Sequence, residues 1–131
     1  MRPLPPTALA LGFVDCINRG DLDGLVARMS EDHRLEVFDQ APVVGRDENR
    51  GAWRGYLQSF PRYVIYPHRI AAEGDVVAIL GHTTGSHLGL PDVEEEKLLL
   101  IWLAYVRDAA VARWCLLEDT AANRKRLGLD V

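Results

Sequence analysis

The residues best suited to chemistry lie in the stretch "GHTTGSHLGLP", which spans residues 81–91 and holds two of the four histidines of the chain. Paired histidines can bind a metal ion or act as acid and base. His82 and His87 are five positions apart, however, so on an unbroken strand they point to opposite faces. A bulge at Gly85 would change this, but no other group of Cys, His or carboxylate residues has metal-ligand spacing. We therefore expect no metal site and no cofactor, with His82 on the face opposite His87.

Other chemistries are excluded for similar reasons. The stretch lacks the lysine of a phosphate-binding loop and does not lead into a helix. The serines of the chain lack the strained turn that a nucleophilic hydrolase needs. The remaining histidines, His33 and His68, fall in strand-like segments near the expected sheet margin. For both of them a structural or exposed role is favoured over a catalytic one.

The composition is typical of a soluble globular protein. With 131 residues the chain is long enough for one hydrophobic core, so we expect a single domain over 1–131 with an irregular lead-in at 1–6. A net charge of -4 provides no basic surface for nucleic acid. Cys16 and Cys115 lie in apolar patterns, which predicts buried free thiols rather than a disulfide.

The N-terminal segment, with its paired prolines, differs from a signal peptide. No segment approaches the roughly 20 apolar residues that are needed to span a membrane. These features predict a cytoplasmic protein that does not interact with membranes.

The first half of the chain is predicted to contain three helices and one strand. Apolar residues at spacings of three and four predict helices over 7–19 and 21–30. Alternation of apolar and polar residues predicts a strand over 33–39. A third helix is expected over 47–59, with Asp47 as its N-cap.

The second half is predicted to be a run of strands. The four segments are 62–70, 75–87, 96–106 and 110–119, followed by a short helix over 120–129. Short connections join two pairs of these strands, which implies antiparallel neighbours. Because the helices precede the strands, the order predicts an α+β fold with a curved antiparallel sheet and helices on one face.

The run of residues 98–106 contains no charge, so neither face of this strand can be fully solvated. One face must pack against the helices. The other face needs a second cover, and the simplest is another copy of the chain packed sheet to sheet. The sequence therefore predicts a homodimer through the outer sheet face.

Four segments together resemble the nuclear transport factor 2-like superfamily, and most closely its SnoaL-like branch. They are "NRGDLDGLVARMSEDHRLEVF", "APVVGRDENRGAWRGYL", "AAEGDVVAILGHTTGSHLG" and "ARWCLLEDTAANRKRLGL". The resemblance covers nearly the whole chain and implies a cone, in which a strongly bent sheet wraps around the N-terminal helices and leaves an internal apolar pocket. The superfamily includes polyketide cyclases, ketosteroid isomerase and modules that only bind proteins, so activity has to be argued from the site residues.

The isomerase residues of the superfamily are missing from this chain. Its tyrosine and two aspartates would fall at Phe13, Val37 and near Ile101, none of which can donate or accept a proton. Steroid-type isomerisation by that set of residues is therefore not expected. Phe13 and Val37 would instead line the pocket.

The last strand is more similar to the SnoaL-like cyclases, in which a tryptophan is followed closely by an acid that acts in ring closure. Strand parity from Trp114 favours Glu118 as that acid, whereas the spacing to the following Leu-Gly favours Asp119. A carboxylate at the rim of an apolar pocket has a raised proton affinity, as a base working near neutral pH requires. The alternative is that Asp119 or Thr120 simply caps the terminal helix.

The resemblance also implies a role for His87, because "TGSHLG" is similar to a cyclase segment whose histidine reaches the pocket. The alternative is a histidine in solvent at a strand end. Four further aromatic residues could line the pocket, although aromatic residues at such spacings are more often plain core: Trp53, Tyr56, Trp102 and Tyr105. Trp114 is expected beside them.

Two functions remain open at this point. One is a small-molecule enzyme that performs acid–base chemistry on an apolar, cyclic or polyketide-like compound, with Glu118 or Asp119 as acid and base and with His87 positioning the substrate oxygen. The other is a ligand-binding or dimeric accessory module of the same fold without catalysis. The two are distinguished by whether a carboxylate and a histidine converge on the pocket.

Overall fold

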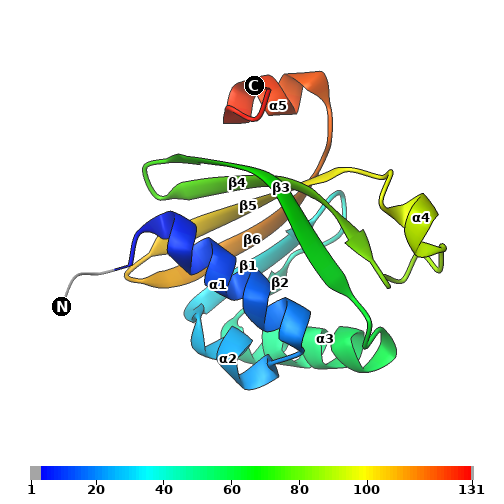
Figure 1. The fold of residues 1–131 in the computed structure, drawn as a ribbon. Coiled ribbons are helices and arrows are strands. Elements are labelled where there is room, and N and C mark those ends of the chain that lie inside the picture. Colours follow the sequence, from blue (N-terminus) through cyan, green and yellow to red (C-terminus); the bar gives the residue numbers. More distant parts are fainter. Residues whose placement is uncertain (1–3, 131) are drawn as a thin grey trace.

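The computed structural model describes residues 4–130, which form five helices and one six-stranded sheet (Figure 1). The elements, in chain order, are α1 (Pro6–Arg19), α2 (Leu22–Ala27), β1 (Met29–Val37), β2 (Val43–Val44), α3 (Arg46–Ser59), β3 (Val64–Glu73), β4 (Val76–Thr84), α4 (Asp92–Glu95), β5 (Leu100–Arg107), β6 (Ala110–Glu118) and α5 (Ala121–Leu127). The α+β class predicted from the sequence is confirmed. Residues 1–3 of the expected lead-in lie outside the described residues.

Local signals explain how the first two helices begin and end. Helix α1 starts at Pro6, where a missing N–H costs nothing, and stops at Gly20, whose φ of +65° is the left-handed conformation that favours glycine. Helix α2 begins after Asp21, whose carboxylate accepts a hydrogen bond from the Gly24 N–H at 3.0 Å. The sequence-based prediction extended this helix too far, because Met29 is already the first residue of β1.

The N-cap of helix α3 lies two residues earlier than predicted. Gly45, with φ of +99°, is its N-cap, and Asp47 lies in the first helical turn instead of capping it. A carboxylate in the first turn is still favourable, because it faces the positive end of the helix dipole. The segment before α3, predicted as a loop, contains the two-residue edge strand β2.

The strand order in the sheet is β2-β1-β6-β5-β4-β3. Four of the five pairings are antiparallel, but β1 pairs with β6 in parallel. The wholly antiparallel sheet predicted from the sequence was wrong in this pairing. No hairpin joins these two strands, which lie near opposite ends of the chain, so no short connection forces them to be antiparallel.

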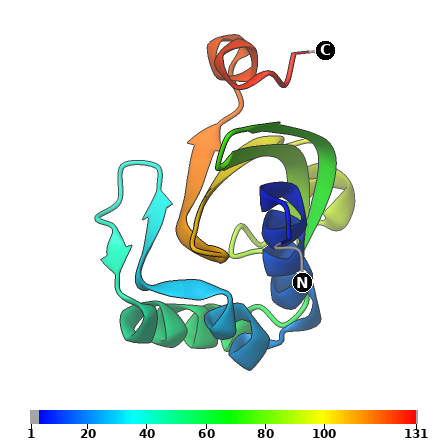
Figure 2. The same ribbon diagram turned by 90° about the vertical axis from the view of Figure 1, so that its left-hand side faces the viewer.

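The sheet bends around α1, and α3 lies beneath its concave side (Figure 2). The concave face forms one hydrophobic core with these helices, built from residues such as Phe13, Ile17, Trp102 and Trp114. Alternate residues of the same strands, including Leu80, Ile101 and Leu103, form a second cluster on the convex face. The two-faced character predicted for the uncharged strand β5 is therefore real.

The convex face is covered in part by the C-terminal segment of the same chain. Leu127 and Leu129 pack on the convex cluster, and Leu129 is fully buried. Arg69 of β3 holds this segment by donating to the Leu129 carbonyl at 3.0 Å. Figure 1 shows α5 on the side of the sheet away from α1, α2 and α3. The cover that the sequence analysis assigned to a second subunit is thus supplied partly by the chain itself.

Both cysteines are buried free thiols, as predicted. Cys16 lies in the core beneath the concave face, and Cys115 belongs to the convex cluster. Burial raises the pKa of the Cys115 thiol to about 11. Among residues 4–130, no helix is long and apolar enough to cross a membrane.

Candidate active site

One end of the concave face is open to solvent. Strands β1 and β6 run in parallel and both end there, and β5 begins there. Four aliphatic residues of these strands point to the concave side yet stay partly exposed: Leu35, Val37, Leu100 and Leu116. Inward-facing aliphatic side chains on central strands are normally fully buried. Their exposure indicates that the helices leave this end of the concave face uncovered.

Most of the expected pocket residues lie on this face or beside it, but Tyr105 does not: it alternates with Trp102 along β5 and packs on the convex cluster. Phe13 and Trp114 are buried behind the partly exposed residues, with ring centroids 4.8 Å apart. Trp102 is buried on the same face of β5, Val37 is partly exposed at the end of β1, and Trp53 is buried in the core on α3. The aromatic residues are therefore the floor of the open end rather than its mouth.

The two candidate acids have different environments. Glu118 ends β6 on the same face as Trp114 and Leu116, opposite Leu100, and is exposed. Asp119 accepts two hydrogen bonds from Arg124, at 2.6 and 2.7 Å. These bonds hold the pKa of Asp119 below its ordinary value. Asp119 is thus bound to the terminal helix, which leaves Glu118 as the unpaired carboxylate.

Of Asp119 and Thr120, the two residues considered as the N-cap of α5, Thr120 is the one that caps the helix. The Thr120 side chain accepts a hydrogen bond from the Asn123 N–H at 3.0 Å. Thr120 follows Asp119 directly, so the cap and the Asp119–Arg124 ion pair together fix the chain where it leaves β6. They also fix the direction in which Glu118, the last residue of the strand, leaves the sheet.

His87 contacts Tyr56 at the C-terminal end of α3. The Tyr56 hydroxyl is 2.9 Å from His87 Nδ1 and accepts a hydrogen bond from the His87 main-chain N–H at 3.3 Å. Tyr56 packs on the concave core, and burial raises its pKa. This contact draws an otherwise exposed histidine against the apolar interior.

The structure does not bring the predicted acids and His87 together. Among residues 4–130, no hydrogen bond or ion pair joins His87 to Glu118 or Asp119. The two sites are separated in the sheet order, since His87 follows β4 whereas Glu118 ends β6. Any reaction that used both groups would need a substrate large enough to reach from one to the other.

A buried carboxylate supports the segment that carries His87, and the sequence analysis missed it. Glu95 of α4 is only 1% exposed and accepts hydrogen bonds from the Thr83 hydroxyl and from the Ser86 N–H, the latter at 3.4 Å. These contacts tie the 85–99 segment to the end of β4. Glu95 belongs to the acidic run "DVEEE", in which nothing distinguishes the buried member from its exposed neighbours.

The other three histidines, His33, His68 and His82, lie away from His87. His82 lies on the convex face, where its ring stacks on Tyr66 and its Nδ1 is 2.6 Å from His68 Nε2, so the expected separation of His82 from His87 is confirmed. Of the structural and exposed positions expected for His33, the structure shows a buried one, with its Nδ1 on the Val111 carbonyl. This residue is 0% exposed and its ring lies 5.7 Å from that of Phe13 on the concave side. Within the described part of the chain, no three Cys, His, Asp or Glu side chains are grouped as metal ligands.

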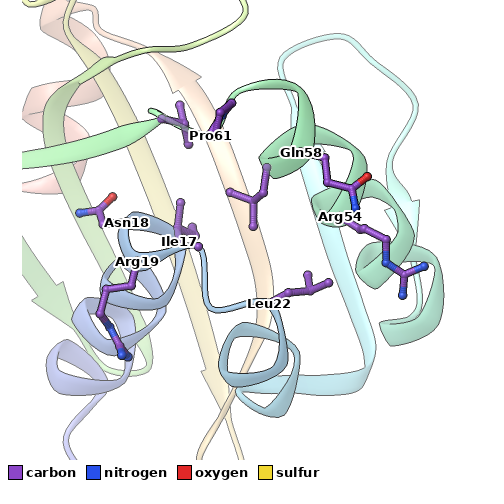
Figure 3. Close-up of a pocket in the computed structure, with 10 residues that line it drawn as sticks. Ile17, Asn18, Arg19, Leu22, Arg54, Gln58 and Pro61 are labelled. Atoms are coloured by element: carbon purple, nitrogen blue, oxygen red, sulfur yellow. The ribbon is translucent and has the colours of Figure 1, made fainter.

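A separate cleft of about 390 Å³ lies between the C-terminal end of α1, α2 and α3 (Figure 3). Ile17, Leu22 and Leu57 contribute apolar walls, and Arg19 and Arg54 flank it from opposite helices. None of the residues expected to line the pocket lines this cleft. It is therefore distinct from the open end of the concave face.

Comparisons with known proteins agree with this architecture. A family model described as SnoaL-like domain matches residues 10–114. A search among curated proteins found no match to this chain.

Three similar solved structures illustrate the likeness. A candidate polyketide cyclase from Sinorhizobium meliloti is 20% identical, with a TM-score of 0.71, and the match covers 86% of this chain and 94% of the other. A candidate SnoaL-like polyketide cyclase from Jannaschia sp. CCS1 is 18% identical, with a TM-score of 0.69 and coverage of 96% and 93%. TerC, crystallised with polyporic acid, is 15% identical, with a TM-score of 0.70 and coverage of 95% and 99%. At these identities the likeness shows the fold alone.

Proposed function

The chain belongs to the family of SnoaL-like domains, and we propose that it is an enzyme that performs acid–base chemistry on an apolar, cyclic or polyketide-like compound held at the open end of the concave face. One observation carries this proposal. Leu35, Val37, Leu100 and Leu116 remain partly exposed on the inner face of the sheet, and Glu118 continues that face at its rim. A partly exposed apolar surface with a carboxylate at its edge suits proton abstraction from an apolar ligand.

In this proposal Glu118 is the base. Its carboxylate takes a proton from a carbon beside a substrate carbonyl, the electron pair moves onto the carbonyl oxygen, and the proton later returns to carbon or oxygen. His87, held by Tyr56, positions another oxygen of the substrate, at a distance from the carbon that Glu118 deprotonates. Asp119 is not the base in this proposal, because its ion pair with Arg124 lowers its pKa and makes it a weaker proton acceptor. The names of the similar cyclases and of TerC support the choice of ligand class.

The experiment is a search for proton abstraction that needs no knowledge of the product. Steroids, terpenoids and polyketide fragments are first screened by thermal shift, because a ligand that binds the native state raises the melting temperature. Ketones that bind are then incubated with the protein in D₂O, and exchange at the carbon beside the carbonyl is followed by NMR. The expected result is catalysed exchange in the wild type.

Two neighbouring variants provide the contrast. Glu118→Gln should lower the exchange rate by roughly 10²- to 10⁴-fold, the usual contribution of a general base. Asp119→Asn, next to it in the chain, keeps an acceptor for Arg124 and should lower the rate far less than Glu118→Gln does. Equal rates for Glu118→Gln and the wild type would refute Glu118 as the base.

The second candidate is a ligand-binding or accessory module without catalysis. It is favoured by the absence of contact between His87 and either acid among the described residues. It predicts melting-temperature shifts with the same compounds but no exchange above the uncatalysed rate, in the wild type as in Glu118→Gln. The D₂O experiment therefore separates the two functions directly.

Assembly is a further part of the proposal. We infer a homodimer through the convex face, where Tyr66 remains exposed beside the region covered by α5. Light scattering at micromolar concentration should give twice the chain mass of 14.6 kDa, and Tyr66→Arg should shift it toward the monomer. A monomeric mass for the wild type would contradict this part alone.

A further inference from the structure

Buried polar atoms without partners gather between α3 and β1. Among residues 4–130 there are four such side-chain atoms: His33 Nε2, Arg46 Nε, Asn49 Oδ1 and Trp53 Nε1. Three of them belong to α3 at spacings of three and four, and therefore lie on one face of the helix. The fourth belongs to β1, against which that face packs, since Asn49 Nδ2 donates to the His33 carbonyl at 3.1 Å.

Such a grouping needs an explanation. Buried polar atoms in native proteins nearly always have a hydrogen-bond partner, and an orphan atom points to a bound water or to a ligand. Here all four orphans fall in one helix–strand contact, which we call the α3–β1 seam. A random scatter of packing defects would not select a single contact of the fold.

The hydrogen-bonding state of His33 follows from its geometry. Its Nδ1 lies 2.6 Å from the main-chain carbonyl oxygen of Val111, which can only accept, so Nδ1 carries the hydrogen. Burial lowers the pKa of His33, which keeps the ring neutral near pH 7. Nε2 is then an unprotonated acceptor, and a partner for it has to be a hydrogen-bond donor.

The seam is continuous with the open end of the concave face. On β1 the inward-facing residues are His33, Leu35 and Val37 in order, and Leu35 and Val37 are partly exposed there. Trp114 is opposite Leu35 on β6. His33 therefore lies one step deeper along the same face of β1. Trp53, on the facing helix, supplies a buried N–H donor.

We propose that the α3–β1 seam binds a hydroxyl group of the ligand. This hydroxyl, carried by an aromatic or enol ring, donates to His33 Nε2 and accepts from the Nε1–H of Trp53. A hydroxyl satisfies both orphan atoms because it is both donor and acceptor, whereas an ether or a ketone cannot donate to His33. The inference rests on the proposed apolar-ligand function and names the polar group by which that ligand is recognised.

The test compares two ligands of the same ring system, one with a hydroxyl group that can donate a hydrogen bond and one with a methyl ether that cannot. Binding of 2-naphthol and of 2-methoxynaphthalene is measured by titration calorimetry on the full chain. Loss of the one donor should weaken binding by roughly 5- to 150-fold, because it leaves a buried acceptor unpaired. In parallel, long-range ¹⁵N–¹H NMR spectra of the wild type should show the His33 Nε2 resonance moving with 2-naphthol and staying in place with the ether.

His33→Asn is the matched variant, because its amide nitrogen can still donate to the Val111 carbonyl while the second ring nitrogen is removed. It should abolish the preference for the hydroxyl compound. His68→Asn, the same change at an exposed histidine on the convex face, should preserve it. The NMR readout keeps the proposal testable if His33→Asn does not fold.

The remaining outcomes distinguish a failure of the hydroxyl site from a failure of the proposed apolar-ligand function. Equal binding of both naphthalenes, with no movement of the His33 resonance, would overturn the hydroxyl site and leave an apolar-ligand function standing; the seam would then hold water only. Binding of neither compound would count against both. A preference for the hydroxyl compound that survives in His33→Asn would also overturn the assignment to His33.

Discussion

The side chain of Asn18 ties α1 to the edge of the sheet, and its removal gives the sharpest test of how the site is supported. Its Nδ2 donates to the Ile65 carbonyl at 2.9 Å, and its Oδ1 accepts from the Ile65 N–H at 2.8 Å. Because β3 is the last strand in the sheet order, these main-chain groups have no further strand to pair with. The Asn18 carboxamide takes the place of that missing strand.

The expected loss of stability follows from the main-chain groups that the substitution leaves unpaired. Asn18→Ala leaves one N–H and one carbonyl of the buried Ile65 without partners, at about 1–3 kcal/mol each. Asn18 is itself only partly buried, so water replaces some of the lost bonding and the lower half of the range applies. We expect a loss of about 2–4 kcal/mol in the free energy of unfolding, which is a large share of the roughly 5–15 kcal/mol of a typical domain.

Urea unfolding followed by tryptophan fluorescence measures this loss. Asn18→Asp should be destabilising as well, because a carboxylate can accept from the Ile65 N–H but cannot donate to the carbonyl. Asn123→Ala is the control, because Asn123 makes its bonds at the exposed end of α5 and should cost less than about 1 kcal/mol. A value for Asn18→Ala within 1 kcal/mol of the wild type would show that this edge is solvated and would refute the reasoning.

Three other predictions concern the buried titratable groups. Glu95→Leu should speed hydrogen exchange at the Ser86 amide and lower stability. Glu95→Gln keeps an acceptor and should have a smaller effect. Identical exchange in the wild type and both variants would show that Glu95 does not hold the 85–99 segment. Cys115, with its pKa raised to about 11, should resist iodoacetamide at neutral pH in the native protein and react after denaturation, as peptide mapping would reveal. The pKa of His33 in the folded protein lies below its ordinary 6.5, so the unfolded chain binds more protons and stability falls as the pH drops through that value. Urea unfolding at about pH 7.5 and 5.5 should therefore show a smaller decline for His33→Asn than for the wild type, and equal declines would contradict the assignment.

Local patterns were enough to predict most of the fold. The helix at α1 and the uncharged strand β5 follow from apolar spacing that has only one sensible reading. Met29 was misplaced because an apolar residue at this position fits both the stripe of a helix and the alternation of a strand. The parallel pairing of β1 with β6 was also missed, since it joins segments about 80 residues apart and no short-range signal encodes it.

The site was less predictable for the same reason. Parity placed Glu118 on the face of Trp114, because both lie on one strand. It could not show that Arg124 captures Asp119, that Tyr56 holds His87, or that Glu95 is buried, because each depends on contacts between elements.

In the proposed function, the parallel pairing sets the length of the ligand. Because β1 and β6 run in the same direction, His33 to Val37 on one strand and Trp114 to Glu118 on the other both lead from the core to the rim. Each run spans about 13 Å at about 3.3 Å per residue. The register places Leu35 opposite Trp114, so His33 lies deeper than Trp114 and Glu118 lies beyond Val37. A ligand whose hydroxyl binds at His33 and whose acidic carbon lies at Glu118 therefore has to be longer than either run, and a two-ring probe fills only the deep end. Lengthened hydroxyaryl ketones should therefore bind more tightly and undergo exchange that depends on Glu118, whereas 2-naphthol binding should be insensitive to Glu118→Gln. If Glu118→Gln weakened 2-naphthol binding as strongly as His33→Asn, the two groups would share one subsite and the elongated arrangement would be wrong.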